Sequence, residues 1–173
     1  MKLIYSIHKY DVTMFTWLNG VAIHAYLVRF CRMISRTADG FLYVLLAAWL
    51  YWDHGINDAL LRAMILAFLI ERPVYTLLKK GFKRNRPQHA LQDFKSAITP
   101  SDQFSFPSGH TSAAFMVATL LGYFAPSLMP ALYVWAALVG FSRVVLGVHF
   151  PTDTLMGVVL GVSTAIFSLD YIL

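Results

Sequence analysis

The sequence is poor in charged residues and in cysteine, and both shortages narrow the class of protein. Only 13% of the 173 residues are charged, while 58% are hydrophobic. A soluble domain of this length has about 25% charged and about 45–50% apolar residues. The balance argues against a soluble domain and predicts a membrane protein. The single cysteine, Cys31, excludes an intrachain disulfide and provides no metal-ligand pattern.

Three further features are missing from the sequence. The N-terminal segment MKLIYSIHKYDVTMF lacks the uninterrupted apolar core and the small-residue cleavage site of a signal peptide. No Asp, Glu, His and Cys residues have the spacing of a metal cage, so we expect no metal and no cofactor. A broad basic face is also missing, which argues against nucleic acid as a partner. Much of the net charge of +5 lies in one segment, on Lys79, Lys80, Lys83, Arg84 and Arg86.

Long apolar stretches are what the sequence has instead. A helix that crosses a bilayer needs roughly 20 mostly apolar residues. By that criterion the sequence predicts an all-α fold, a polytopic transmembrane helical bundle with about six spans. The predicted spans cover residues 12–33, 38–53, 57–79, 108–125, 127–147 and 151–172.

The segments between these stretches indicate one domain. The only long polar segment, about 80–106, is too short for a second domain, so we interpret residues 1–173 as a single membrane-embedded domain with a polar loop over one face. Pro151 suits the first turn of the last span. Gly157 and Gly161 form a GxxxG pattern, which permits close helix contact. We interpret this pattern as packing within the bundle, and the sequence indicates no oligomeric state.

With six spans, alternate connections lie on the same side of the membrane, and this brings the polar residues near the span ends together. This parity places the connection between the third and fourth spans on the same side as the one between the fifth and sixth. Three polar clusters flank these connections, and we therefore expect one active site at one membrane face. The clusters are Lys79 with Arg86, Ser108 with Gly109 and His110, and Arg143 with His149 and Asp153.

These residue types suit one chemistry. Fixed cations and the N–H groups at the start of a helix bind an anion, and Gly109 lets the backbone approach it closely. One histidine can attack phosphorus while the other protonates the leaving oxygen. Asp153, four residues after His149, can orient that ring. The pattern predicts phosphoryl transfer without a metal.

Each cluster also has an ordinary structural interpretation. Lys79 and Arg86 can mark the membrane edge, Ser108 can cap a helix, and Asp153 can complement a helix dipole. Arg143 is the exception, because an arginine near a membrane interior is costly and is a functional candidate by default. Glu71 and Arg72, inside the third span, either pair with groups such as Arg36 or Lys80 or extend to the membrane surface, and we favour structural pairing.

The three clusters resemble the signature of the type 2 phosphatidic acid phosphatase (PAP2) family. That signature reads KxxxxxxRP, PSGH and SRxxxxxHxxxD. Here the corresponding segments are KKGFKRNRP at 79–87, PSGH at 107–110 and SRVVLGVHFPTD at 142–153, with every defining position present. Three ordered elements with correct internal spacing are far more specific than one PSGH alone.

The resemblance implies roles and a fold. His149 would be the nucleophile that forms a phosphohistidine, Asp153 would orient it, and His110 would protonate the leaving alcohol and then activate water. The remaining signature residues would hold the phosphoryl oxygens; they are Lys79, Arg86, Ser108, Gly109 and Arg143. The family fold is a helical core, embedded in the bilayer in its lipid phosphatases.

Several functions share these motifs. The leading hypothesis is a lipid phosphate phosphohydrolase, with undecaprenyl diphosphate, phosphatidylglycerophosphate or phosphatidic acid as candidate substrates and the bilayer as its environment. A lipid phosphotransferase would use the same phosphohistidine. Vanadium-dependent haloperoxidases have a similar anion site but are soluble, which the apolar spans contradict. A non-catalytic lipid-phosphate-binding protein should lack some catalytic groups, and none is missing here.

Two signals disagree on the orientation of the protein. The resemblance implies a bacterial inner or plasma membrane with the active site on the extracytoplasmic side. Positive residues tend to remain on the cytoplasmic side, and that rule favours the opposite orientation. The residues responsible are Arg29, Arg32, Arg36 and the basic loop at 79–95.

Overall fold

The regular structure of the protein is helical. The computed structural model describes residues 2–20, 24–100 and 102–173, and within these ranges only an isolated bridge between Asn85 and Phe104 is extended. The all-α prediction is therefore confirmed. The helices are α1 (Lys2–Asn19), α2 (His24–Arg36), α3 (Gly40–His54), α4 (Ala59–Phe82), α5 (Pro87–Ala90), α6 (Gly109–Phe124), the 3₁₀ turn η1 (Pro126–Leu128), α7 (Met129–Val145) and α8 (Pro151–Ile172).

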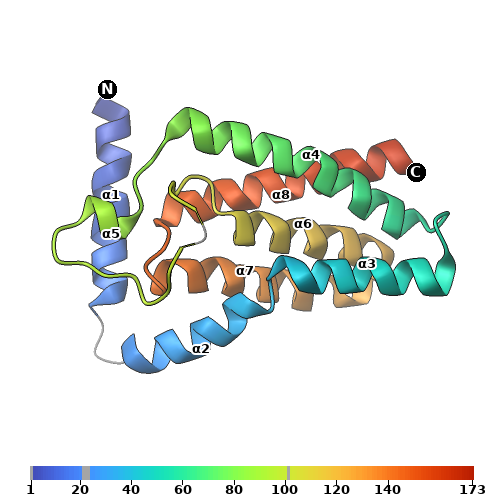
Figure 1. Ribbon diagram of the computed structural model, residues 1–173, viewed down its shortest axis with the longest axis horizontal. Helices are drawn as coiled ribbons and strands as arrows, with labels where there is room; N and C mark the ends of the chain where they lie inside the picture. The colour runs from blue at the N-terminus through green and yellow to red at the C-terminus, as the bar shows by residue number, and fades with distance from the viewer. Residues whose placement is uncertain (1, 21–23, 101) are drawn as a thin grey trace.

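The long helices form a bundle around α6. Helices α3, α4, α6, α7 and α8 run alongside one another, and α1 stands across one end of them (Figure 1). Residues 111–120 of α6 are all buried, because α4, α7 and α8 pack around this helix. On the outer surface of the bundle, large apolar side chains are exposed, as lipid-facing residues would be; examples are Trp52, Leu69 and Phe167.

Two glycines let α8 lie directly against α6. A Cβ atom added to Gly161 would lie 2.2 Å from the backbone oxygen of Ser112, and one added to Gly157 would lie 2.7 Å from that of Ser108. No real side chain fits at either distance. The interpretation of the GxxxG pattern as packing within the bundle is confirmed, and the contact holds the start of α8 beside the start of α6.

Replacing Gly161 with alanine should destabilise the protein. Its Cβ would meet backbone rather than a flexible side chain, so α8 and α6 must move apart, and we expect a loss of about 1–3 kcal/mol in the free energy of unfolding. Gly81→Ala is the matched control, since a Cβ there meets nothing within 4 Å and alanine favours a helix. Unfolding in detergent measures both; equal stability of the two variants would contradict the packing argument.

Three helical segments of the described chain are long and apolar enough to cross a membrane. They are Ala25–His54, Pro126–Val145 and Pro151–Ile172, which contain or closely match the predicted spans at 38–53, 127–147 and 151–172. The predicted spans at 57–79 and 108–125 correspond to α4 and α6. The count of six spans stays a prediction.

The first predicted span is wrong as a single helix. The structure divides residues 12–33 between α1, which ends at Asn19, and α2, which begins at His24; residues 21–23 lie outside the described part. Polar Asn19 interrupts the apolar stretch at the end of α1. Helix α1 instead turns Asp11 and Phe15 inward while Trp17 remains exposed, so its inner face covers the end of the bundle.

Candidate active site

The signature residues meet at the end of the bundle beside α1. This is the end at which α4 and α7 finish and α6 and α8 begin (Figure 1). The helix ends bring together residues that are far apart in the sequence, as predicted. The residues at this end are Lys79 in the last turn of α4, Arg86 after it, Ser108, Gly109 and His110 at the start of α6, Arg143 in the last turn of α7, His149 in the α7–α8 turn and Asp153 in the first turn of α8.

Two of the predicted phosphate-binding cations converge on a carboxylate that we did not predict. Lys79 Nζ donates to both carboxylate oxygens of Asp102, at 2.7 and 2.6 Å, and Arg86 Nη2 donates to Oδ1 at 2.7 Å. Tyr75 donates its hydroxyl to Oδ2 at 2.9 Å. The Asp102 carboxylate therefore lies where the donors of these two cations converge. Burial alone would raise the pKa of Asp102, but the hydrogen bonds from Lys79 and Arg86 outweigh it and lower this pKa to about 2.

His149 is enclosed, with its two ring nitrogens in different surroundings. Nε2 faces Arg86, whose Nη1 lies 3.4 Å away, and Nδ1 lies 3.6 Å from Asp153 Oδ2. That gap is slightly longer than a hydrogen bond, and Nδ1 has no other partner in the described chain. The carboxylate favours the proton on Nδ1, which leaves the Nε2 lone pair directed at the cations. Burial lowers the pKa of His149 to about 4, although Asp153 opposes the shift.

Asp153 is held in place from three sides. Its Oδ2 accepts from the Phe150 backbone N–H at 2.8 Å, and its Oδ1 accepts from Arg84 Nη1 at 2.8 Å. Its backbone oxygen accepts from the Ser108 N–H at 2.9 Å. The carboxylate is fully buried, so these contacts replace the water that it has lost. The same residue thus orients His149 and ties α8 to the start of α6.

Arg84 connects this carboxylate to α1. Its Nη2 donates to Asp11 Oδ2 at 2.6 Å and its Nη1 donates to Thr152 Oγ1 at 2.7 Å. Asp11 in turn accepts from the Thr152 N–H at 3.0 Å and is almost completely buried. One cation therefore lies between two buried carboxylates, and we infer that Arg84 is a positioning residue for Asp153.

Replacing Arg84 with glutamine should slow the chemical step more than it weakens substrate binding. The variant leaves Asp153 without its cation, and loss of such a supporting contact costs about 10- to 100-fold in activity at comparable sites. We expect the loss in kcat, with KM changed little. The less compensated carboxylate would also favour the protonated ring of His149, so the acid limb of the pH profile should move to higher pH. Lys80→Gln, at an exposed position of α4, is the control; an unshifted limb would leave Arg84 with a structural role only.

Arg143 and the start of α6 complete the cationic end. Arg143 is almost fully buried, its Nη1 donates to Ser35 Oγ of α2 at 2.6 Å, and its Nε has no partner in the described chain. Ser108 occupies the N-cap position of α6, but its hydroxyl makes no cap bond and lies 2.9 Å from Thr111 Oγ1. The interpretation of Ser108 as a helix cap is therefore right for its position and wrong for its side chain. The N–H groups of the first turn of α6, from Gly109 on, have no helical acceptor and can serve an anion.

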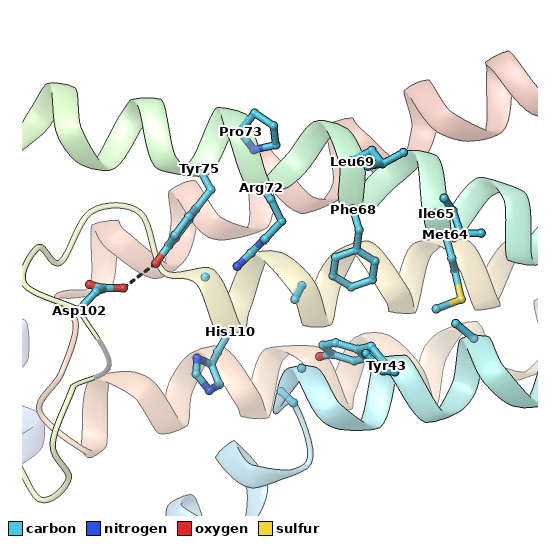
Figure 2. Close-up of a pocket in the computed structure, with 16 residues that line it drawn as sticks. Tyr43, Met64, Ile65, Phe68, Leu69, Arg72, Pro73, Tyr75, Asp102 and His110 are labelled. Atoms are coloured by element: carbon cyan, nitrogen blue, oxygen red, sulfur yellow. Dashed lines mark hydrogen bonds between the residues drawn. The ribbon is translucent and has the colours of Figure 1, made fainter.

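His110 lies at the edge of an apolar pocket. Its Nε2 lies 3.2 Å from Asp39 Oδ1 at the start of α3. A pocket of about 920 Å³ begins at His110, Asp102, Arg72 and Tyr75 and continues between α3 and α4. Its far part is apolar, with Tyr43, Met64, Ile65 and Phe68 projecting into it (Figure 2). One long groove therefore ends at Asp102 and at Gly109 and His110 of the signature.

Glu71 and Arg72 pair with each other, and not with Arg36 or Lys80 as expected. Arg72 Nη2 donates to Glu71 Oε1 at 2.8 Å, and its Nε donates to Oε2. Ser112 of α6 also donates to Oε1, at 2.7 Å. Glu71 is fully buried, so the pair with Arg72 and the contact to α6 satisfy its charge. The structural interpretation holds, but with different partners.

Sequence reasoning missed the supporting residues of the site. Arg84 was counted only as a loop charge, and Asp11, Asp39 and Asp102 were not singled out, because an aspartate near a helix end or in a polar loop is ordinary. Each meets its partner across the fold. Within the described chain no group of three His, Cys, Asp or Glu side chains is placed to hold a metal; independence of metal stays a prediction.

The fold and the site together define a class: an all-helical membrane protein in which cationic side chains and two histidines lie at one end of the bundle. The chain belongs to the PAP2 superfamily, whose profile matches residues 59–172. The predicted family is confirmed, and with it the integral-membrane character of the protein.

Relatives of known name agree with this assignment. The chain is 38% identical over 131 residues to phosphatidylglycerophosphatase B of Bacillus subtilis, a match that covers 69% of this chain and 61% of the relative. It is 35% identical over 92 residues to decaprenylphosphoryl-5-phosphoribose phosphatase of Mycobacterium tuberculosis, covering 53% of this chain and 50% of that one. The chain thus spans between half and two thirds of the length of these relatives.

Two crystal structures share the fold over nearly the whole chain. The structure of Aquifex aeolicus LpxE has a TM-score of 0.81 and 30% identity, with 92% of this chain and 94% of that chain covered. The transmembrane PAP2 type phosphatidylglycerolphosphate phosphatase of Bacillus subtilis has a TM-score of 0.80 and 28% identity, covering 96% of this chain and 86% of that one.

Proposed function

We propose that this protein is a lipid phosphate or diphosphate phosphohydrolase that works through a phosphohistidine on His149. One observation carries the proposal: Gly109 and His110 of the signature line the polar end of an apolar groove of about 920 Å³, together with Asp102, the carboxylate that Lys79 and Arg86 bind. A lipid chain would lie in the apolar part, beside Tyr43 and Phe68 (Figure 2), and its phosphate would reach Lys79 and Arg86 at the Asp102 end. Relatives that are named as phosphatases of lipid-linked phosphates support the same activity.

The proposed reaction has two displacements at phosphorus. In the first, Nε2 of His149 forms a bond to phosphorus as the bond to the leaving oxygen breaks, and His110 gives that oxygen a proton. In the second, His110 takes a proton from water, whose oxygen bonds to phosphorus and breaks the bond to His149. The products are the lipid alcohol, or the lipid monophosphate from a diphosphate, and inorganic phosphate. The proposed role of His110 is supported by its position at the groove that would hold the leaving group.

The cations would stabilise the charge on phosphorus in both steps. The phosphoryl group would replace the Asp102 carboxylate at Lys79 and Arg86, whose donors already converge on one anion. Arg143 and the N–H groups at the start of α6, including Gly109 beside Ser108, would bind the remaining oxygens. Fixed donors of this kind need no reorganisation during the reaction, which is the main source of their effect.

Phosphate release from a panel of purified lipids tests the function. The panel contains undecaprenyl diphosphate, phosphatidylglycerophosphate and phosphatidic acid, each in detergent with excess chelator. We expect free phosphate from at least one lipid without any added acceptor lipid, and inhibition by vanadate. Turnover only with an acceptor lipid would identify a phosphotransferase, and binding without turnover would identify a lipid-phosphate-binding protein. Activity that disappears with chelator would contradict the metal-free mechanism.

The acid limb of the pH profile should lie unusually low. His149 must be neutral to attack, and its pKa of about 4 in the folded protein means that it remains neutral well below the ordinary value for histidine. As pH falls through about 4, protonation removes the nucleophile, so kcat/KM should decline there. Tryptophan fluorescence over the same range separates titration from unfolding. A limb near pH 6.5, with the fold intact, would contradict the burial of a neutral His149.

We also propose that the site faces the extracytoplasmic side, as the family resemblance implies. Gln92 is exposed in the polar loop near the site, while Cys31 is buried. Gln92→Cys therefore provides one accessible thiol, and the unchanged protein is the control. Labelling of intact cells by a membrane-impermeant maleimide is the expected result. Labelling only after permeabilisation would reverse the orientation.

A further inference from the structure

A second cavity lies beside His110, apart from the apolar groove. Its volume is about 410 Å³, and it lies between α2, the loop at 97–99 and the end of α7. Three arginines line it, Arg32 and Arg36 from α2 and Arg143 from α7, together with Ser35, Asp39 and His110. His110 therefore borders both the apolar groove and this polar cavity.

The positive charge in this cavity is compensated only in part, because one carboxylate, Asp39, lines it with three arginines. Arg32 and Arg36 are four residues apart on α2, so they project from the same face and repel each other. Arg32 Nη2 donates to the backbone oxygen of Ala97 at 2.9 Å, but within the described residues none of the three arginines is ion-paired with a carboxylate. The only lining carboxylate, Asp39, faces His110. A concave site with such an excess of cations is suited to an anion.

The position of the cavity indicates which anion. In the proposed reaction the leaving group is on the side of His110, opposite His149, and the released phosphate departs from the same centre. We propose that the cavity is a second phosphate site, in which Arg32 and Arg36 bind a phosphate group next to the reaction centre. The ligand is either the phosphate of the lipid that is not cleaved or the inorganic phosphate that has just been released. The choice of ligand rests on the proposed function.

This assignment also accounts for part of the charge on α2. Arg32 and Arg36 lie on the side of the bundle that carries the site, where the positive-inside rule predicts the cytoplasm. As ligand-binding residues they carry no information on orientation. Arg29 of the same helix is exposed and does not line the cavity, which makes it a matched control.

Binding of methylenediphosphonate tests the site without turnover. This probe carries two phosphonate groups joined by carbon, so the enzyme cannot hydrolyse it. Arg32→Gln/Arg36→Gln should bind it on the order of 10- to 100-fold more weakly than the wild type, by titration calorimetry in detergent. Arg29→Gln should bind it as the wild type does. Arg36→Gln alone keeps the Arg32 bond to Ala97 and should show a smaller loss; equal affinities of the double variant and Arg29→Gln would overturn the proposal.

Kinetics of the same variants distinguish the two ligands. If the site holds the uncleaved phosphate of the lipid, kcat/KM should fall about 10-fold or more for a lipid diphosphate and hardly change for a monophosphate with the same chain. If it holds released phosphate, the inhibition constant of inorganic phosphate should rise, while kcat/KM for the diphosphate relative to that for the monophosphate should be unchanged. Absence of phosphate release by the wild type would contradict the proposed function but not the second phosphate site, because the binding experiment does not require turnover.

Discussion

His149→Ala should lose at least about 10⁴-fold in kcat/KM for every lipid phosphate that the wild type hydrolyses. The variant removes the only group that forms the covalent bond to phosphorus in the proposed mechanism. Its ring nitrogen Nε2 faces Arg86 at 3.4 Å, and no other described nucleophile is placed there with an orienting carboxylate behind it. The expected loss does not depend on the leaving group, because both displacements pass through this nitrogen.

Labelling separates this loss from unfolding. Acid-labile phosphate from a labelled substrate should accumulate on the wild-type protein during turnover and be absent from His149→Ala. His54→Ala is the control, since His54 is exposed at the far end of α3 and contacts Asp53 and Trp49 of the same helix. Phosphate bound covalently to the His149 variant, or its turnover within about 10-fold of the wild type, would remove His149 as the nucleophile.

His110→Ala should lose about 10²–10⁴-fold with lipid phosphates, the range for a general acid. The loss depends on the leaving group, which distinguishes this variant from the first. An alkoxide leaves poorly without a proton, whereas the anion of p-nitrophenol leaves without one. Formation of the phosphohistidine from p-nitrophenyl phosphate should therefore be nearly normal in His110→Ala.

Pre-steady-state kinetics provide the measurement for His110. A burst of p-nitrophenol followed by slow turnover is expected, because His110 is still needed to activate water in the second displacement. Asp39→Asn is a useful companion, since Asp39 lies 3.2 Å from His110 Nε2 and should retain the acid in a less favourable orientation. An equal loss for p-nitrophenyl phosphate and for lipid phosphates in the burst phase would contradict the role of general acid.

The positions of the predicted site residues follow from the helix ends on which they lie. Lys79 and Arg143 occupy the last turns of α4 and α7, while His110 and Asp153 occupy the first turns of α6 and α8. Apolar stretches of membrane length already indicate where helices end, so parity alone assigns these turns to one side. The same reasoning failed for residues 12–33, because hydropathy does not show that α1 lies across the bundle.

The sequence by itself determined the residues on which the proposed chemistry depends: two histidines, an aspartate four residues after one of them, and cations at the spacing of a PAP2 signature. It also indicated a close helix contact at Gly157 and Gly161 within the bundle, and the structure shows that the partner helix is α6.

Only the tertiary structure decided which partners hold these residues. Arg84 and Asp153 are 69 residues apart and meet at 2.8 Å, and Arg86 meets Asp102 across a loop. Spacing along a chain determines which side chains share a helix turn. Contacts between distant segments form only when the helices pack, and no local pattern encodes them. The apolar groove and the second cavity are likewise spaces between packed elements, so they exist only in the folded protein.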